Sequence, residues 1–267
     1  MDFLLVILSL VMGLVIGSFL GAFTYRWGKG LSVADGRSFC PHCKAKISWL
    51  DNVPVVSYLL LKGKCRSCGN KISLRYPAIE LSTALLFGLL GYFYLIEGPQ
   101  STNTLFLFWS KALGPLFLPT LFFVVSCLIA IFVIDLENQL IPDSLVFILF
   151  VLAFLGLILT YGKSPFAHLA AGFSVSLFLL LIGLFTRGKG MGMGDVKLAL
   201  AAGTILGWPH ALTWLFASFV LGGAAGLLLV LSKKASFGKH IPFGPFLVVS
   251  FFVVVVFGDN FLKWLGI

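Results

Sequence analysis

The chain has 267 residues, of which 59% are hydrophobic and only 11% are charged, and it contains 28 Phe. A soluble domain is usually about 45–50% apolar and about 25% charged, so this chain lacks the polar surface that a soluble globule needs. A soluble fold is therefore excluded. The net charge is +9. In such an apolar chain, an excess of basic residues indicates cytoplasmic loops of a membrane protein more than nucleic-acid binding.

Apolar runs predict the membrane-spanning helices, each of which needs about 20 apolar residues. Seven runs meet or approach this length, at 3–25, 78–96, 116–134, 144–161, 166–185, 211–231 and 244–263. A shorter eighth run at 196–208 is interrupted by Gly203 and Gly207, so seven spans with a re-entrant segment is the alternative. The predicted fold is an all-α polytopic membrane protein with about eight transmembrane helices.

The basic residues predict the orientation of these helices. Ten of the 19 Lys and Arg residues fall between Arg26 and Arg75, and most others fall in the 186–194 and 232–243 loops. With eight spans these segments share one face, which the positive-inside rule makes cytoplasmic. Both termini are then outside. The first run lacks a basic start and a small-residue cleavage site, so we interpret it as a retained span.

Three regions follow from this organisation. Residues 1–25 form the first transmembrane helix, residues 26–77 a small cytoplasmic insert, and residues 78–267 a bundle of transmembrane helices. Chains of about 40–60 residues rarely bury enough core without an additional cross-link. The insert is therefore expected to need a metal or disulfides.

Four of the five cysteines supply such a cross-link as two C-x2-C pairs, Cys40 with Cys43 and Cys65 with Cys68. Four thiolates at this spacing can surround Zn²⁺ tetrahedrally, as in structural zinc sites. Two disulfides or redox pairs are disfavoured by the predicted cytoplasmic location, and a reduced tetrad without metal is the other alternative. We predict a zinc-ribbon-like insert whose fold depends on the metal.

Two acidic segments lie at membrane edges, where ionisable residues are costly and often functional. Segment 134–143 contains Asp135 and joins two apolar runs, and segment 190–197 contains Asp195 and opens the short run. Because the topology puts both on the cytoplasmic side, the two aspartates can meet. Of two carboxylates sharing a site, one can donate a proton while the other activates water, as in an aspartic protease. A solvated carboxylate at the membrane edge is the alternative for Asp135.

The neighbouring residues have supporting or ordinary roles. Gly192 and Gly194 would allow close backbone approach and positive φ beside Asp195, leaving room for an extended substrate. Asp143 precedes an apolar run and is predicted to be a helix N-cap. Asp195 could also cap its own helix, and Lys197 could pair with it.

Taken together, the motifs resemble the type IV prepilin peptidase family, within the wider group of G-x-G-D intramembrane aspartic peptidases. These bacterial leader peptidases serve pili, competence pseudopili and type II secretion. The resemblance covers nearly the whole chain, and its specificity comes from the order of several short motifs. They are 17–20 with 25–26, both cysteine pairs, 51–54 with 57–58, 72–77 with Glu80, 134–136 with 141–143, 192–198 and 241–245.

The resemblance implies a catalytic pair and a supporting set, which are Asp135 with Asp195, and Gly192, Gly194, Lys197 and Asp143. It implies cleavage of the basic leader of prepilins and pseudopilins after a glycine. S-adenosylmethionine-dependent methylation of the new N-terminal residue, often Phe, would follow and would use the insert. No cofactor-binding residue is assigned. The chain departs from many members at Gly21 and at Trp27-Gly28, in the region implied for methyl transfer.

The expected partners are prepilins with an apolar N-terminal helix and the lipid bilayer, with no nucleic acid. The expected location is the bacterial cytoplasmic (inner) membrane, with the active site at its cytoplasmic face. A proton- or cation-coupled transporter is the main alternative, although no internal repeat is evident. A membrane-tethered zinc-ribbon binding module would explain the insert but not the two acidic segments.

Overall fold

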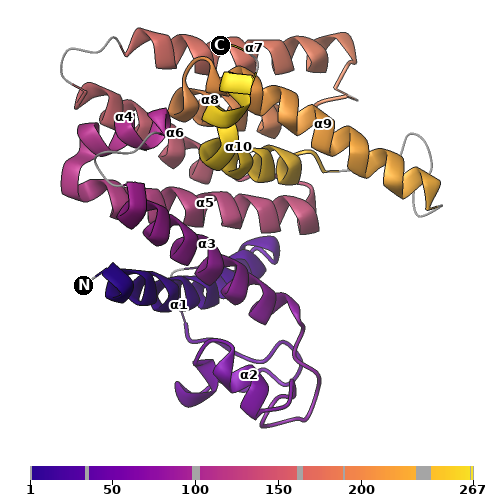
Figure 1. Ribbon diagram of the computed structural model, residues 1–267. Coiled ribbons are helices and arrows are strands. Elements are labelled where there is room, and N and C mark those ends of the chain that lie inside the picture. Colours follow the sequence, from indigo (N-terminus) through magenta and orange to yellow (C-terminus); the bar gives the residue numbers. More distant parts are fainter. Residues whose placement is uncertain are drawn as a thin grey trace. The chain divides into compact units, whose positions relative to one another are not determined.

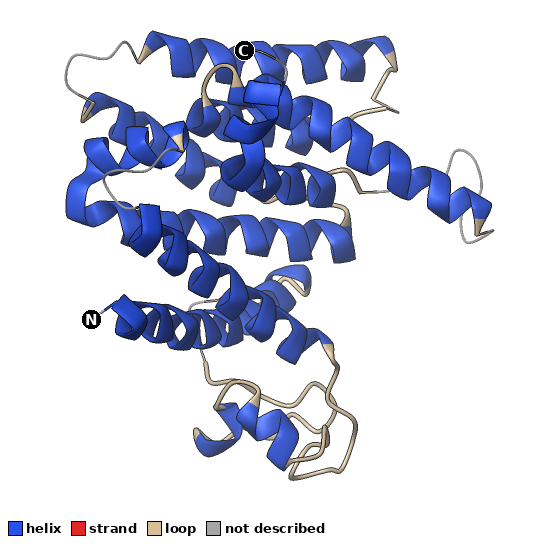
Figure 2. Ribbon diagram, in the orientation of Figure 1, coloured by secondary structure: helices blue, strands red, loops and turns tan. Residues whose placement is uncertain are grey.

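The computed structural model describes residues 2–33, 36–97, 103–160, 165–188, 190–232, 242–264 and 266. Within these residues the chain is helical and contains no β-strand (Figure 2), which confirms the predicted all-α class. The helices are α1 (Asp2–Gly28), η1 (Leu50–Asn52), α2 (Val56–Leu60), α3 (Arg75–Glu97), α4 (Thr104–Leu113), η3 (Gly114–Leu116), α5 (Phe117–Asn138), α6 (Asp143–Ile158), α7 (Phe166–Phe185), α8 (Met193–Leu206), α9 (His210–Leu231) and α10 (Gly244–Trp264). Parts of both basic loops, at 189 and 233–241, and the end of the predicted 144–161 run lie outside the described residues.

Among the described residues, six helical segments are long and apolar enough to cross a membrane, so this is a multi-pass membrane protein. They correspond to six of the predicted runs, within one residue at the end of 78–96, and are Phe3–Gly28, Arg75–Leu95, Thr104–Asn138, Phe166–Phe185, His210–Leu231 and Gly244–Trp264. The other two predicted helices form but are shorter, with 16 residues in α6 and 14 in α8. A helix of the length of α8 extends only about 21 Å, against about 30 Å of hydrocarbon.

Helix α4 is the element that the apolar runs did not predict. Asn103 caps its start, because the side-chain oxygen accepts a hydrogen bond from the Phe106 N–H at 3.0 Å. Its apolar side is buried, and η3, which contains Pro115, follows directly and leads into α5. The N-cap asparagine was the sequence signal that could have revealed this helix.

The chain divides into two compact units, Met1–Ile96 with Leu118–Ala130, and Glu97–Phe117 with Ile131–Ile267. In the first unit the backbones of α1 and α3 touch, as small residues allow in membrane helices. A Cβ atom on Gly13 would lie only 2.6 Å from the Cα of Ala84. The rings of Phe87 and Phe122 stack at 4.2 Å between centroids and join α3 to the first part of α5.

In the second unit α8 is the central helix and packs against α6, α7, α9 and α10 (Figure 1). Its closest neighbour is α7, where a Cβ on Gly203 would lie 2.9 Å from the Cα of Gly172. The indole of Trp109 in α4 donates a hydrogen bond to the Ile205 carbonyl near the end of α8, at 2.9 Å. Helix α8 is therefore buried on most sides, and its first turn carries Asp195 into the interior of this unit.

Candidate active site and metal centre

Asp135 and Asp195 both lie in the second unit and are both buried. Asp135 is in the last turn of α5 and is 5% exposed, and Asp195 is in the first turn of α8 and is 8% exposed. The two carboxyl groups are close enough for the charge of Asp135 to act on Asp195. After Asp135 the chain leaves the helix through Gln139, which is left-handed (φ 55°) and donates its N–H to the Asp135 carbonyl at 2.9 Å.

The start of α8 fixes the orientation of the Asp195 side chain. Its Oδ2 accepts a hydrogen bond from the N–H of Gly192, the residue that precedes the helix, at 3.2 Å. Asp195 thus caps its own helix from the third position. The expectation of positive φ at the glycines was wrong, because Gly192 has φ −78° and Gly194 is helical. Close approach is what Gly194 provides, since a Cβ there would lie 2.9 Å from the Cβ of Ile141.

The carboxyl of Asp135 has a different environment. Its Oδ2 is the one buried side-chain oxygen or nitrogen, within the described part of the chain, that lacks a hydrogen-bond partner. Leaving a buried polar atom unpaired is unfavourable by about 1–3 kcal/mol, so such atoms are rare and call for an explanation. The first residue of α10, Gly244, lies directly beside this oxygen.

Asp143 and Lys197 form an ion pair at the starts of α6 and α8. The Lys197 Nζ lies 2.8 Å from Oδ1 and 2.7 Å from Oδ2 of Asp143. The N-cap role predicted for Asp143 was wrong, because Pro142 is the N-cap and Asp143 is the first helical residue. Lys197 pairs with Asp143 and not with Asp195. The side chain of Asp143 is 70% exposed, whereas Asp135 and Asp195 are buried.

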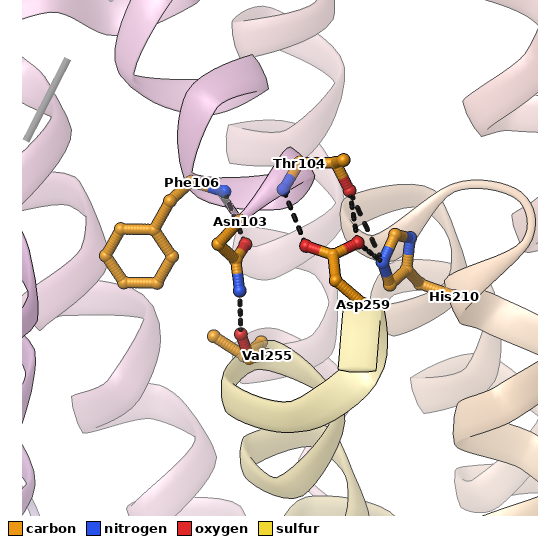
Figure 3. A network of polar contacts seen from close by, with 6 residues as sticks. All are labelled: Asn103, Thr104, Phe106, His210, Val255 and Asp259. Atoms are coloured by element: carbon orange, nitrogen blue, oxygen red, sulfur yellow. Dashed lines mark hydrogen bonds and ion pairs between the residues drawn. The ribbon is translucent and has the colours of Figure 1, made fainter. Parts of the chain in front are cut away.

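A second polar cluster joins α4, α9 and α10 and was missed by the sequence analysis (Figure 3). Asp259 accepts hydrogen bonds from the Thr104 N–H and hydroxyl, both at 2.7 Å, and contacts His210 Nε2 at 2.9 Å. Asn103 donates to the Val255 carbonyl at 2.8 Å. The signal for this cluster was an aspartate inside an apolar run and a histidine at the start of another.

In the insert, the four cysteines predicted as metal ligands come together. Their sulfur atoms all lie within 4.8 Å of one another, and the Sγ atoms of Cys40 and Cys68 are 3.9 Å apart. All four are free thiols, so the pairs form no disulfide. This cluster is able to hold a metal ion.

The two C-x2-C loops have the same backbone pattern. The Cys40 N–H donates to the Ala45 carbonyl at 2.9 Å, and the Cys65 N–H donates to the Asn70 carbonyl at 2.8 Å. Equivalent residues four positions after the first cysteine of each pair, Lys44 and Gly69, have positive φ of 60° and 71°. Backbone N–H groups point at two of the sulfur atoms, those of His42 and Cys43 at Cys40 and that of Asn70 at Cys68.

The electrostatics of the insert differ between two of the thiols. Burial alone would raise the pKa of the Cys40 thiol, but hydrogen bonds from the Cys43 and His42 backbone and from neighbouring thiols lower it to about 7. Although the Asn70 backbone lowers it, the pKa of the Cys68 thiol is raised to about 11 by burial and by hydrogen bonds with the other three cysteines. Next to this cluster, Arg66 binds both oxygens of Asp51 at 2.7–3.1 Å and lowers the pKa of that carboxyl. This pair ties the second cysteine loop to η1.

Fold and site together define a polytopic helical membrane protein with two interacting buried aspartates and a separate four-cysteine insert. Residues 11–94 match the model of the bacterial peptidase A24 N-terminal domain, and residues 122–227 match that of the type IV leader peptidase family. The chain belongs to the type IV leader peptidase family. This confirms the family resemblance found in the sequence.

Curated relatives carry the name prepilin leader peptidase/N-methyltransferase. The chain is 38% identical to the one from Neisseria gonorrhoeae, with 84% of this chain and 72% of the relative covered. It is 33% identical to the one from Aeromonas hydrophila, covering 85% and 74%. It is also 33% identical to the one from Bacillus subtilis (strain 168), covering 92% and 93%. No solved structure matches the chain.

Proposed function

We propose that this chain is an intramembrane aspartic endopeptidase that removes the leader of prepilins and pseudopilins and then N-methylates the new N-terminus. The observation that carries the proposal is the buried pair of Asp135 and Asp195, in which the charge of Asp135 acts on Asp195. The names of the relatives support both activities. The family gives no support to the transporter alternative.

The proposed mechanism requires the two carboxyls to share one proton, because neighbouring buried carboxylates do not both ionise readily. The ionised carboxylate takes a proton from water, and the water oxygen attacks the scissile carbonyl carbon. The protonated partner gives its proton to the carbonyl oxygen. The resulting diol collapses when the first carboxyl protonates the leaving nitrogen, the C–N bond breaks, and the partner takes a proton from a diol hydroxyl. A carboxylic acid and a free amine leave, and the pair again holds one proton.

The substrate proposal follows from charge and membrane placement. A basic leader would stay in the cytoplasm, on the side of the basic loops, while the apolar helix that follows it enters the bilayer. The scissile bond after the leader glycine would then lie at the membrane edge. The cytoplasmic face of the inner membrane is accordingly the proposed location of Asp135 and Asp195, with Gly192, Gly194 and the Asp143–Lys197 pair in supporting roles.

We also propose that the four cysteines hold one structural Zn²⁺. A tetrahedral site with Zn–S bonds of about 2.3 Å separates sulfur atoms by about 3.8 Å, and the 3.9 Å between Cys40 and Cys68 fits this spacing. Four thiolates fill the coordination sphere and leave no position for a reacting water. The zinc ion would therefore stabilise the fold of the insert and take no part in a reaction.

The zinc proposal is tested by metal analysis of the purified chain in lipid nanodiscs. We expect about one zinc per chain, and we expect Cys65→Ser to release it and to make the insert sensitive to protease. The fifth cysteine, Cys127, is buried in α5 and gives the matched control, so Cys127→Ser should keep the metal. A folded, protease-resistant insert without metal would contradict the proposal.

Methyl transfer would use S-adenosylmethionine, whose methyl group would pass to the free amine. The described residues do not identify its binding site. Two acidic side chains of the first unit that could bind its charged or hydroxyl groups already have partners, since Asp51 binds Arg66 and Glu80 accepts from the Val55 N–H at 2.7 Å. No residue is therefore assigned to this step.

One experiment tests both activities. The full chain in nanodiscs is incubated with a full-length prepilin, with and without S-adenosylmethionine, and the products are analysed by intact mass spectrometry. We expect cleavage after the leader glycine, with one added methyl group when the cofactor is present. Supplying a pilin that is already cleaved separates methylation from hydrolysis. An intact prepilin after incubation with the folded chain would refute the peptidase proposal.

A further inference from the structure

The first residue of α10 lies against the carboxyl of Asp135. A Cβ atom on Gly244 would lie 2.5 Å from Asp135 Oδ2 and 3.0 Å from its Cγ. The backbone N–H of Gly244 faces the same carboxyl group. No side chain fits at this position unless Asp135 moves, so glycine is required here for close approach of the backbone.

Ile141 fills the adjoining space. Its Cδ1 lies 3.2 Å from the position that a Cβ of Gly244 would take, and its Cβ lies 2.9 Å from the corresponding position at Gly194. The starts of α8 and α10 therefore both contact this one side chain, and both do so with a glycine. An added methyl at Gly244 could not move toward Ile141 without a second clash.

The surroundings give Asp135 little freedom to adjust. Its side chain is 5% exposed, Gly244 is buried, and Oδ2 has no hydrogen-bond partner. An unpaired buried oxygen opposes folding, so its retention beside a close-packed backbone points to a use in the reaction.

We propose that Gly244 is a positioning residue of the active site, which holds Asp135 Oδ2 at the place from which it reacts. This inference rests on the proposed peptidase function. Gly244 belongs to the 241–245 motif by which the chain resembles the family, while the matched family model itself ends at residue 227. Bringing an added Cβ to ordinary contact would displace the carboxyl by about 1 Å, and a misplacement of that size can lower a rate by about 10²-fold.

The test compares Gly244→Ala with Gly223→Ala on prepilin cleavage in nanodiscs. Gly223 lies in α9, and a Cβ there would meet no atom within 4 Å, so it is a matched control. We expect Gly244→Ala to lower kcat by about 10²-fold with KM changed by less than about threefold, and the control to cleave like the wild type. Wild-type kcat for Gly244→Ala, beside an active wild type, would overturn the inference and leave the peptidase proposal intact.

A second measurement covers the case in which Gly244→Ala folds poorly. Because the added methyl clashes with the Asp135 carboxyl, the clash should disappear when that carboxyl is removed. We expect Gly244→Ala to lower the thermal stability of the wild type but to have little effect in an Asp135→Ala background. Equal destabilisation in both backgrounds, or failure of the double variant to fold, would show that Gly244 does not act through Asp135.

Discussion

Helix α10 contacts the carboxyl group of Asp135 at its start and carries that of Asp259 near its end, and the two groups differ in how their oxygens are paired. Near its end, Asp259 accepts two hydrogen bonds from Thr104 and contacts His210 (Figure 3). At its start, Gly244 touches Asp135, whose Oδ2 has no hydrogen-bond partner. The two positions are about 22 Å apart along the helix axis.

In the proposed mechanism, this difference separates a structural carboxylate, Asp259, from a reactive one, Asp135. The bonds of Asp259 connect α10 to the starts of α4 and α9, and a partly buried charge is tolerated when it is paired in this way. Asp135 lacks such compensation at Oδ2 and shares its surroundings with a second acid, Asp195. A group that is left unpaired at a cost to stability is available to exchange protons with a substrate.

The comparison is tested most strongly by replacing the reactive acids. We expect Asp135→Asn and Asp195→Asn each to lower prepilin cleavage by at least about 10³-fold, because an amide cannot exchange the catalytic proton. The chain should still fold, and for Asp135→Asn the melting temperature should be unchanged or higher, since the neutral amide is less costly to bury. Cleavage assays and thermal unfolding of the same nanodisc samples measure both effects. Wild-type cleavage by either variant would refute the catalytic assignment.

The matched substitution at the other end should give the opposite pattern. In Asp259→Asn, an N–H₂ group replaces one acceptor and leaves a donor of Thr104 or His210 without a partner. We expect a loss of about 2 kcal/mol in unfolding free energy. Cleavage per folded molecule should stay near the wild-type value, because the cluster is far from Asp135. A large fall in kcat at normal stability would show that the Asp259 cluster takes part in the reaction.

The sequence predicted the acids near the start of α10 but not the polar cluster near its end. Asp135 and Asp195 could be found because each adjoins an apolar run, and the cysteine tetrad because its spacing is local. The cluster of Asp259 could not be assembled in advance, since its partners begin two other helices and pair only through the tertiary packing. Gly244 was part of a recognised motif, but its contact with Asp135 depends on how α5 and α10 meet.

The sequence also did not predict the local geometry of two residues near the active site correctly. The Asp143 carboxylate was predicted to cap α6, but a lysine from another helix, Lys197, provides a stronger partner than the local backbone. Likewise, the glycines beside Asp195 were expected to adopt positive φ, whereas Gly192 has φ −78° and Gly194 is helical. In both cases a tertiary contact, with Lys197 of α8 or with Ile141 of the loop before α6, replaced the local role that sequence patterns describe.

The smallest effect is expected at the Asp143–Lys197 pair, which is exposed and joins the starts of α6 and α8. Its side chains are 70% and 47% exposed, and pairs in such surroundings contribute about 0.2–1 kcal/mol. Asp143→Asn should therefore reduce cleavage only a few-fold. The reversed pair, Asp143→Lys with Lys197→Asp, should recover part of the loss, because it restores the attraction. Complete loss of cleavage in a well-folded Asp143→Asn variant would instead identify Asp143 as a catalytic partner, and the division between buried reactive acids and paired structural ones would then be wrong.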